Sequence, residues 1–159
     1  MKHYYQTIKG WFNWPELYAR AVQLAPKKSV FIEIGCYLGK STSCLAVEAI
    51  NSGKDITIYC LDLWEPANKI GCTVDQFMEN LQPAIKAGAR IVTVRGDSVF
   101  GSSLFKDDSV DFVWVDGDWI RFQSPTCYYG KNGVLRPASG GWVWWARSKS
   151  KDWTPEGLK

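Results

Sequence analysis

The sequence predicts an α/β fold with a mainly parallel sheet. Short apolar segments alternate along the chain with segments of helical periodicity, which is typical of parallel βαβ units with right-handed crossovers. Phe112–Val115 is apolar without interruption, as expected of a strand covered on both faces. A glycine-containing turn, Gly35–Gly39, directly follows the first apolar segment, where open α/β sheets bind their ligands. Together these features indicate a Rossmann-like three-layer sandwich.

The order of the elements follows from the hydrophobic pattern. We expect strands over Val30–Ile34, Asp55–Leu61, Arg90–Val94 and Asp111–Val115, and a fifth near Gly141–Ala146. We expect helices over Trp14–Leu24, Ser41–Ile50 and Val74–Ala87. Asn13 is a candidate N-cap of the first helix, with Leu17, Ala21 and Leu24 on one face. Phe77, Leu81 and Ile85 form a stripe on the last helix, and Gly88 closes it.

Length and composition indicate one domain over residues 1–159, with a core at 25–118 and a divergent segment at 119–159. The chain is 46% hydrophobic and 22% charged, and its net charge of +3 is scattered, so neither nucleic acid nor a membrane is an expected partner. There is no apolar segment long enough to span a membrane, and we expect a cytoplasmic protein. The five cysteines form no C-x-x-C pair and are interpreted as free thiols in a reducing compartment.

Polar residues gather where the expected strands end. The first strand ends in Glu33 before the glycine turn, and the second ends at Asp62. Gly96-Asp97-Ser98 follows the third strand and Asp116-Gly117-Asp118 follows the fourth. Glycines let the backbone approach a ligand, and a carboxylate can accept hydrogen bonds from both hydroxyls of a ribose. Each element alone has a simpler reading, such as Asp62 as a surface acid or Asp97 as a turn cap, but their order and spacing favour a cofactor site.

These residues carry a family resemblance. Glu33–Ser41 resembles methyltransferase motif I in the form E-x-G-x-x-x-G-x-S, and Asp62 with Trp64 resembles the D-x-W that follows the second strand. Val110–Asp118 is similar to the DFVFIDGDH of bacterial small-molecule methyltransferases. Over about residues 4–118 the chain thus resembles class I S-adenosylmethionine-dependent methyltransferases, in the subgroup of macrocin O-methyltransferase and the cephalosporin hydroxylase-like proteins. The G-x-G-x-x-G of dehydrogenases is absent, which argues against a nicotinamide cofactor.

The resemblance implies a role for each residue. Glu33 and the turn would hold the methionyl end of S-adenosylmethionine, Asp62 the ribose hydroxyls, Asp97 the adenine, and Asp116 would face the methyl group as the catalytic residue. The expected cofactor site comprises Glu33, Gly35, Cys36, Tyr37, Gly39, Ser41, Asp62, Leu63, Trp64, Gly96, Asp97, Ser98 and Asp116. Asp116 and Asp118 could also hold a divalent cation such as Mg²⁺, although Asp118 has a simpler reading as a turn cap.

The pattern breaks after Asp118. The family has a histidine next, whereas this chain has Trp119, and the only histidine in the sequence is His3. Proline, glycine and a lack of helical periodicity argue against a helix over residues 120–130. Family-like sequence returns near Leu135–Gly141, but we expect the last strands of a full methyltransferase sheet to be lacking. Two explanations stay open: a redesigned substrate side, or residues 119–147 read out of frame in a truncated chain.

The expected function is methyl transfer to a small-molecule acceptor, with oxygen as the target atom. The alternative is a non-catalytic cofactor-binding or assembly module. Without a histidine base we expect weak catalysis, because an unperturbed aspartate is a poor base near neutral pH. We also expect a homo-oligomer formed by residues after Ile120, because an uncovered sheet edge and the tryptophans near it favour association.

Overall fold

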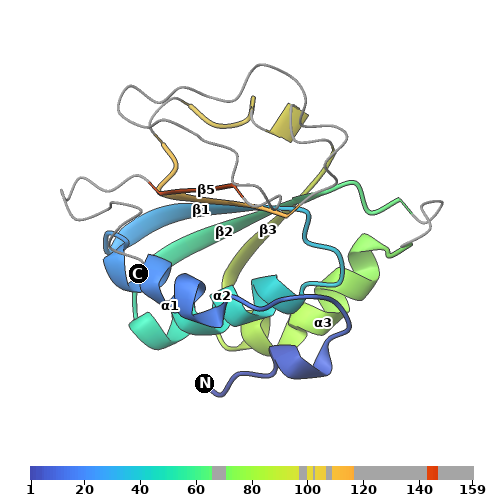
Figure 1. The fold of residues 1–159 in the computed structure, drawn as a ribbon, viewed down its shortest axis with the longest axis horizontal. Helices are drawn as coiled ribbons and strands as arrows, with labels where there is room; N and C mark the ends of the chain where they lie inside the picture. Colours follow the sequence, from blue (N-terminus) through green and yellow to red (C-terminus); the bar gives the residue numbers. More distant parts are fainter. Residues whose placement is uncertain (66–70, 97–99, 102, 107–108, 117–142, 147–159) are drawn as a thin grey trace.

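The structure is a computed structural model that describes residues 1–65, 71–96, 100–101, 103–106 and 109–116, together with the backbone of 143–146. Its sheet has the strand order β3-β2-β1-β4-β5 (Figure 1). The strands are β1 (Lys28–Ile34), β2 (Asp55–Asp62), β3 (Arg90–Arg95), β4 (Phe112–Val115) and β5 (Val143–Ala146). The first four strands run parallel to one another, and β5 pairs with β4 in the antiparallel direction. The predicted Rossmann-like α/β fold is therefore confirmed.

Three α-helices lie on the same side of this sheet (Figure 1). They are α1 (Pro15–Leu24), α2 (Lys40–Ser52) and α3 (Val74–Lys86), and a short 3-10 helix, η1 (Tyr5–Thr7), precedes them. All three agree with the predicted helices to within two residues at either end. Over the residues that the structure describes, no helix is both long and apolar enough to cross a membrane.

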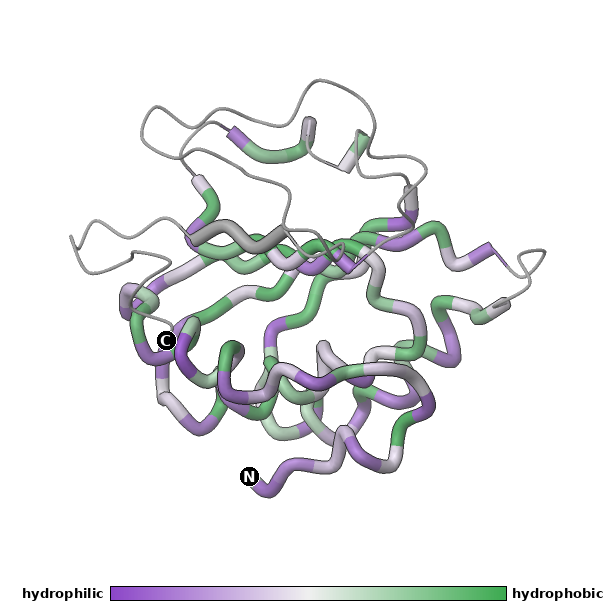
Figure 2. Tube along the Cα trace, viewed as in Figure 1, coloured by the Kyte–Doolittle hydropathy of each residue, from purple (hydrophilic) through white to green (hydrophobic). Residues whose placement is uncertain are grey.

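The core lies between the sheet and these helices, where Figure 2 shows hydrophobic residues on the strands and on the inner helix faces. Alternate residues of β2 (Ile56, Ile58 and Cys60) are buried in this core. On β2, Tyr59 contacts the ring of Phe105 edge-on, with the two centroids 4.9 Å apart. Gly101 lies so close to Leu61 that an added Cβ would meet it at 2.0 Å. Gly101 and Phe105 therefore pack directly on β2.

The start of α1 differs from the prediction. The N-cap is Trp14, whose side chain makes no capping hydrogen bond, so the assignment of Asn13 as the cap is wrong. Pro15 is the first residue of the helix, where its missing N–H costs nothing. The buried face is centred on Tyr18, with Ala21 and Val22, rather than on Leu17 and Leu24. The chain thus turns the tyrosine hydroxyl towards the end of β1.

Candidate functional site

The turn after β1 is held to the end of β2. The N–H of Gly35 donates to the carbonyl of Leu61 at 2.8 Å, and the N–H of Gly39 closes the turn onto the carbonyl of Cys36 at 2.8 Å. Gly39 has φ +83°, and a Cβ there would lie 3.0 Å from the ring of Phe77 in α3. Only glycine meets both demands without strain, so the second glycine of the motif is required by the fold itself.

Asp62 and Trp64, at and just after the end of β2, form hydrogen bonds that hold the same turn. One carboxylate oxygen of Asp62 accepts from the N–H of Tyr37 at 2.8 Å, and the other accepts from the N–H of Trp64 at 3.0 Å. The indole N–H of Trp64 donates to the carbonyl of Tyr37 at 3.1 Å. Asp62 is the last residue of β2, which runs one residue further than the predicted strand Asp55–Leu61. Its carboxylate therefore organises the turn, and each oxygen retains a lone pair for a ligand hydroxyl.

Helix α3 adds a contact that the sequence analysis missed. The side-chain amide of Asn80 donates to the carbonyl of Leu38 at 2.9 Å. The helix begins with a capping box between Thr73 and Gln76, which fixes its first turn. Nothing in the sequence pattern of this amphipathic helix indicated that Asn80 would bind the turn.

The carboxylate of Glu33 is completely buried at the end of β1. One oxygen accepts from the hydroxyls of Tyr18 at 3.1 Å and Ser41 at 2.5 Å, and the other accepts from the hydroxyl of Thr42 at 2.6 Å. Burial raises the pKa of Glu33, and the three hydroxyl donors oppose that shift. Glu33 thus joins β1, α1 and the start of α2 beneath the turn. Its contact with the cofactor stays a prediction, as does that of Ser41, which is also buried.

Two thiols lie beside this carboxylate. The Sγ atoms of Cys36 and Cys60 and a carboxylate oxygen of Glu33 lie within 4.8 Å of one another. Burial raises the pKa of both thiols, which opposes the thiolate form that metal binding or nucleophilic chemistry requires. The thiol of Cys36 donates to the carbonyl of Glu33 at 3.3 Å. These thiols, like Cys44 and Cys72, are unoxidised and buried, and we interpret them as part of the packing.

Asp116 immediately follows β4, and its N–H donates to the carbonyl of Ile34 at 2.7 Å. Burial and the negative charge of Glu33 raise the pKa of Asp116 to about 7, and the indole of Trp114 offsets part of that rise. The sequence analysis took this aspartate to be unperturbed, and that expectation is wrong. A carboxyl group with a pKa near neutrality can exchange protons efficiently at the pH of the cell.

The structure brings most of the predicted site residues to one edge of the sheet. Glu33, Asp62 and Asp116 lie at or just beyond the ends of three parallel strands, and Gly96 joins them because its N–H donates to the carbonyl of Asp62 at 3.0 Å. The carbonyl of Leu63 accepts from Arg95 at 3.2 Å. Asp97, Ser98, Asp118 and Trp119 lie outside the described residues, as does the rest of the divergent segment apart from the backbone of β5.

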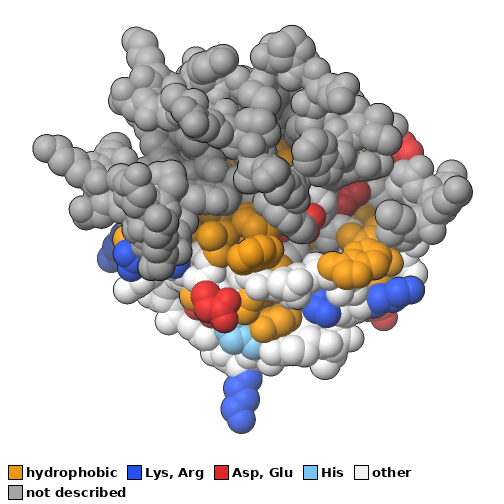
Figure 3. Space-filling model, viewed as in Figure 1, with side chains coloured by type: hydrophobic (Ala, Val, Ile, Leu, Met, Phe, Trp, Pro, Cys, Tyr) orange, Lys and Arg blue, Asp and Glu red, His pale blue; other side chains and the backbone are white. Residues whose placement is uncertain are grey.

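An N-terminal segment lies against the turn. The ring of Trp11 stacks on that of Tyr37 with centroids 6.5 Å apart, and Lys40 donates to the carbonyl of Gly10 at 3.1 Å. The side chain of Trp11 is 78% exposed. Hydrophobic side chains gather in patches on this half of the surface, with charged side chains between them (Figure 3). The Gly10-Trp11-Phe12 motif thus lies next to motif I.

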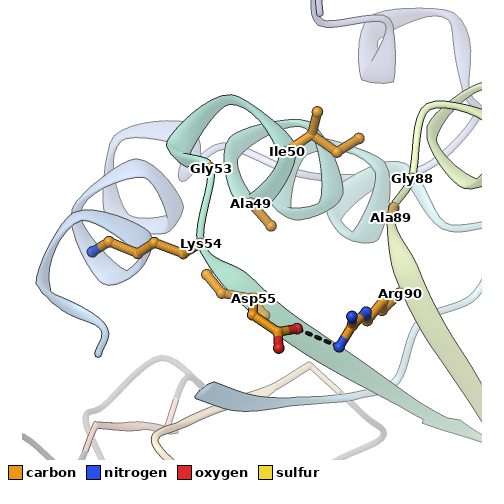
Figure 4. A pocket seen from close by; sticks show the side chains of 9 residues that line it. Ala49, Ile50, Gly53, Lys54, Asp55, Gly88, Ala89 and Arg90 are labelled. Carbon is orange, nitrogen blue, oxygen red and sulfur yellow. Dashed lines mark hydrogen bonds and ion pairs between the residues drawn. The ribbon is translucent and has the colours of Figure 1, made fainter. Parts of the chain in front are cut away.

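A hollow of about 320 Å³ lies where β2 and β3 begin, at the opposite end of the strands from Asp62. Its lining residues are Ala49, Ile50, Gly53, Lys54, Asp55, Ile56, Gly88, Ala89 and Arg90 (Figure 4). Lys54 already donates to three carbonyls at the end of α1, and Asp55 is paired with Arg90. Because these polar groups are satisfied within the chain, we assign no ligand to the hollow.

Comparison with known proteins identifies the family. A family model described as a methyltransferase domain matches residues 32–128, which is more than half of the chain. The chain belongs to this family of methyltransferase domains. Among solved structures, the methyltransferase domain is similar to a cyclopropane-fatty-acyl-phospholipid synthase-like protein from Lactobacillus casei ATCC 334, with 21% identity and a TM-score of 0.42. The similarity covers 64% of this chain and 46% of that one, so the chain matches less than half of its length. No curated protein matches the chain.

The matched region of the methyltransferase domain begins within β1 and passes the end of β4. It includes the turn after β1, Asp62 and Asp116. It also includes two residues that the sequence analysis did not single out, Thr42 and Asn80, whose side chains hold Glu33 and the turn. A signal for Thr42 was present, because a Ser-Thr-Ser run opens a helix directly after a strand that ends in glutamate.

Proposed function

We propose that this methyltransferase domain transfers a methyl group from S-adenosylmethionine to an oxygen atom of a small-molecule acceptor. The cofactor would lie along the carboxyl edge of β1, β2, β3 and β4. Its methionyl end would meet the turn after β1, and Asp62 would accept from the ribose hydroxyls. Asp97 and Ser98 would hold the adenine. When bound, the cofactor supplies an electrophilic methyl group on a sulfonium.

The residues around the turn fit such a ligand. The first N–H groups of α2 have no acceptor within the helix, and they suit the carboxylate of the methionyl end. Gly35 and Gly39 keep side chains away from the backbone of the turn. Asp62 carries two oxygens at the end of the neighbouring strand, each with a free lone pair. These observations support the cofactor assignment without fixing the pose.

The proposal of catalytic activity rests on the position and the pKa of Asp116. Its carboxyl group follows β4 directly, and burial next to Glu33 raises its pKa to about 7. The deprotonated form can accept the proton of an acceptor hydroxyl as the oxygen attacks the methyl group. General-base assistance of this kind typically accelerates a reaction by about 10²–10⁴-fold. A histidine after Asp118 is therefore not needed for a base at neutral pH.

A metal ion has weaker support. The predicted ligands are Asp116 and Asp118, and only Asp116 belongs to the described part of the chain. A carboxyl group with a raised pKa is protonated more often, which lowers its value as a ligand at neutral pH. A Mg²⁺ site therefore stays a prediction, and the proposed proton transfer does not depend on it.

The test is transfer of the labelled methyl group from S-adenosylmethionine to a panel of hydroxylated metabolites, with Asp116→Asn as the matched variant. We expect labelled product with the parent chain and a loss of about 10²–10⁴-fold with the variant. Cofactor binding without product across acceptor classes would instead support a non-catalytic binding or assembly module. Absence of cofactor binding would contradict both functions.

We further propose that the domain forms a homo-oligomer through its C-terminal segment. The strand β5 is at one end of the strand order and pairs with β4 on one side. An edge strand offers backbone donors and acceptors to another chain.

A further inference from the structure

Two side-chain donors hold consecutive carbonyl groups of the cofactor turn. The indole N–H of Trp64 binds the carbonyl of Tyr37 at 3.1 Å, and the side-chain amide of Asn80 binds the carbonyl of Leu38 at 2.9 Å. The donors come from different elements, because Trp64 follows β2 and Asn80 lies in α3. The turn is therefore fixed from two sides by groups that are not themselves part of it.

Holding a carbonyl also fixes the N–H of the next residue. A trans peptide is planar, and its C=O and N–H bonds point in opposite directions. With the carbonyl of Tyr37 turned to Trp64, the N–H of Leu38 faces away from Trp64. Within the described residues nothing accepts a hydrogen bond from this N–H. Trp64 thus orients a backbone donor that is available to a ligand.

The backbone at these positions is held in an uncommon conformation. Tyr37 has φ 47° and Trp64 has φ 42°, both in the left-handed region that non-glycine residues avoid. Residues in such conformations need support from the surrounding structure. Trp64 has that support, because it is 2% exposed and its ring lies 5.0 Å from that of Phe77. An indole that is buried in this way offers almost no surface for direct contact with a ligand.

We propose that Trp64 is a positioning residue, which holds the peptide between Tyr37 and Leu38 so that the N–H of Leu38 binds the carboxylate of the cofactor. Asn80 supports the same turn at the next carbonyl, where the N–H of the following residue, Gly39, closes the turn onto the carbonyl of Cys36. The sequence analysis placed Trp64 among the residues that contact the cofactor, whereas this inference assigns it an action through Tyr37. The inference rests on the proposed function, since it concerns how the methionyl end is held.

The test compares Trp64→Phe with the parent chain. Phenylalanine keeps an aromatic ring against Phe77 but removes the N–H donor. Two ligands are titrated by calorimetry: S-adenosylhomocysteine, which has the amino-acid end, and 5′-methylthioadenosine, which lacks it. We expect about three- to tenfold weaker binding of the first ligand, the equivalent of one neutral hydrogen bond, and unchanged binding of the second. Trp14→Phe is the control, because the side chain of Trp14 is 47% exposed and makes no capping hydrogen bond.

Hydrogen–deuterium exchange of the ligand-free chain gives an independent readout. In Trp64→Phe we expect faster exchange in the peptide that contains residues 36–39 and unchanged exchange across β1. Asn80→Ala should reproduce both effects, and it decides the question if Trp64→Phe does not fold. Unchanged affinity for S-adenosylhomocysteine overturns the inference. So does an equal loss for both ligands with faster exchange throughout, because that is the signature of general destabilisation.

The failure of the proposed function has a different signature. A parent chain that binds neither ligand contradicts the cofactor assignment and the ligand part of this inference together. If the parent chain and Trp64→Phe bind S-adenosylhomocysteine equally tightly, the proposed function stands and only the role of Trp64 is removed.

Discussion

Replacing Asp62 by alanine removes a carboxylate with two functions. In the proposed complex it accepts from both ribose hydroxyls, and such bonds to a charged group contribute about 1.5–3 kcal/mol each. Two such bonds together contribute about 3–6 kcal/mol, and since about 1.4 kcal/mol is tenfold in affinity, we expect binding of S-adenosylhomocysteine to weaken by about 10²–10⁴-fold. The substitution also leaves the N–H groups of Tyr37 and Trp64 without their acceptor. We therefore expect a loss of stability of about 1–3 kcal/mol as well.

Asp55→Ala is the matched control, because Asp55 begins the same strand at its opposite end. Its carboxylate pairs with Arg90 on the surface, and its removal should leave cofactor affinity unchanged. Affinity is measured by titration calorimetry well below the unfolding temperature of each variant, so that the fraction of folded protein stays constant. Equal affinity of Asp62→Ala and the parent chain would mean that the ligand does not lie at the end of β2.

Four further outcomes are expected. The pKa of Asp116 rises from 3.8 to about 7 on folding, so the contribution of this carboxyl group to stability declines as the pH increases through that window. The unfolding temperature of Asp116→Asn relative to that of the parent should therefore increase between pH 4 and pH 8. A difference that stays constant with pH would refute the pKa shift. The parent's kcat/KM should also rise with pH through about 7, and the variant should lose that limb. Thr42→Val leaves one oxygen of Glu33 without its donor and should lower the free energy of unfolding in urea by about 1–3 kcal/mol. Ser43→Ala, whose hydroxyl donates to the carbonyl of Lys40, is the control, and an equal loss in both variants would contradict the network. Light scattering at micromolar concentration should show an oligomer, and a monodisperse monomer would count against association through the C-terminal segment.

The fold was predictable because its signal is local and periodic. Alternating apolar segments and helical stripes identified the strands and helices from residue 15 to residue 115, and the glycine turn indicated the edge of the sheet at which we propose that the cofactor binds. The exact cap of α1 was not predictable, because Asn13 and Trp14 compete for one position and packing of Tyr18 onto Glu33 decides the orientation of the helix. Propensity alone does not contain that tertiary contact.

The chemistry of the site was less predictable than its location. The sequence placed Glu33, Asp62 and Asp116 at strand ends, but it carried no information on their desolvation. The raised pKa of Asp116 depends on its burial and on the charge of Glu33, which is 83 positions away in the chain. Likewise, the hydrogen bond from Trp64 to Tyr37 depends on the left-handed backbone conformation of both residues, which hydrophobic periodicity does not reveal.

Within the part of the chain that the structure describes, the side chains that hold the turn and Glu33 come from residues 10–80, before β3 begins. A ribosome releases this stretch before β3 and β4 are synthesised, so these contacts do not wait for the later strands. The same separation bears on evolution. Under the proposed function, mutations in later parts of the chain would leave these early contacts untouched, and a lineage could explore new acceptors without first rebuilding the residues that hold the turn.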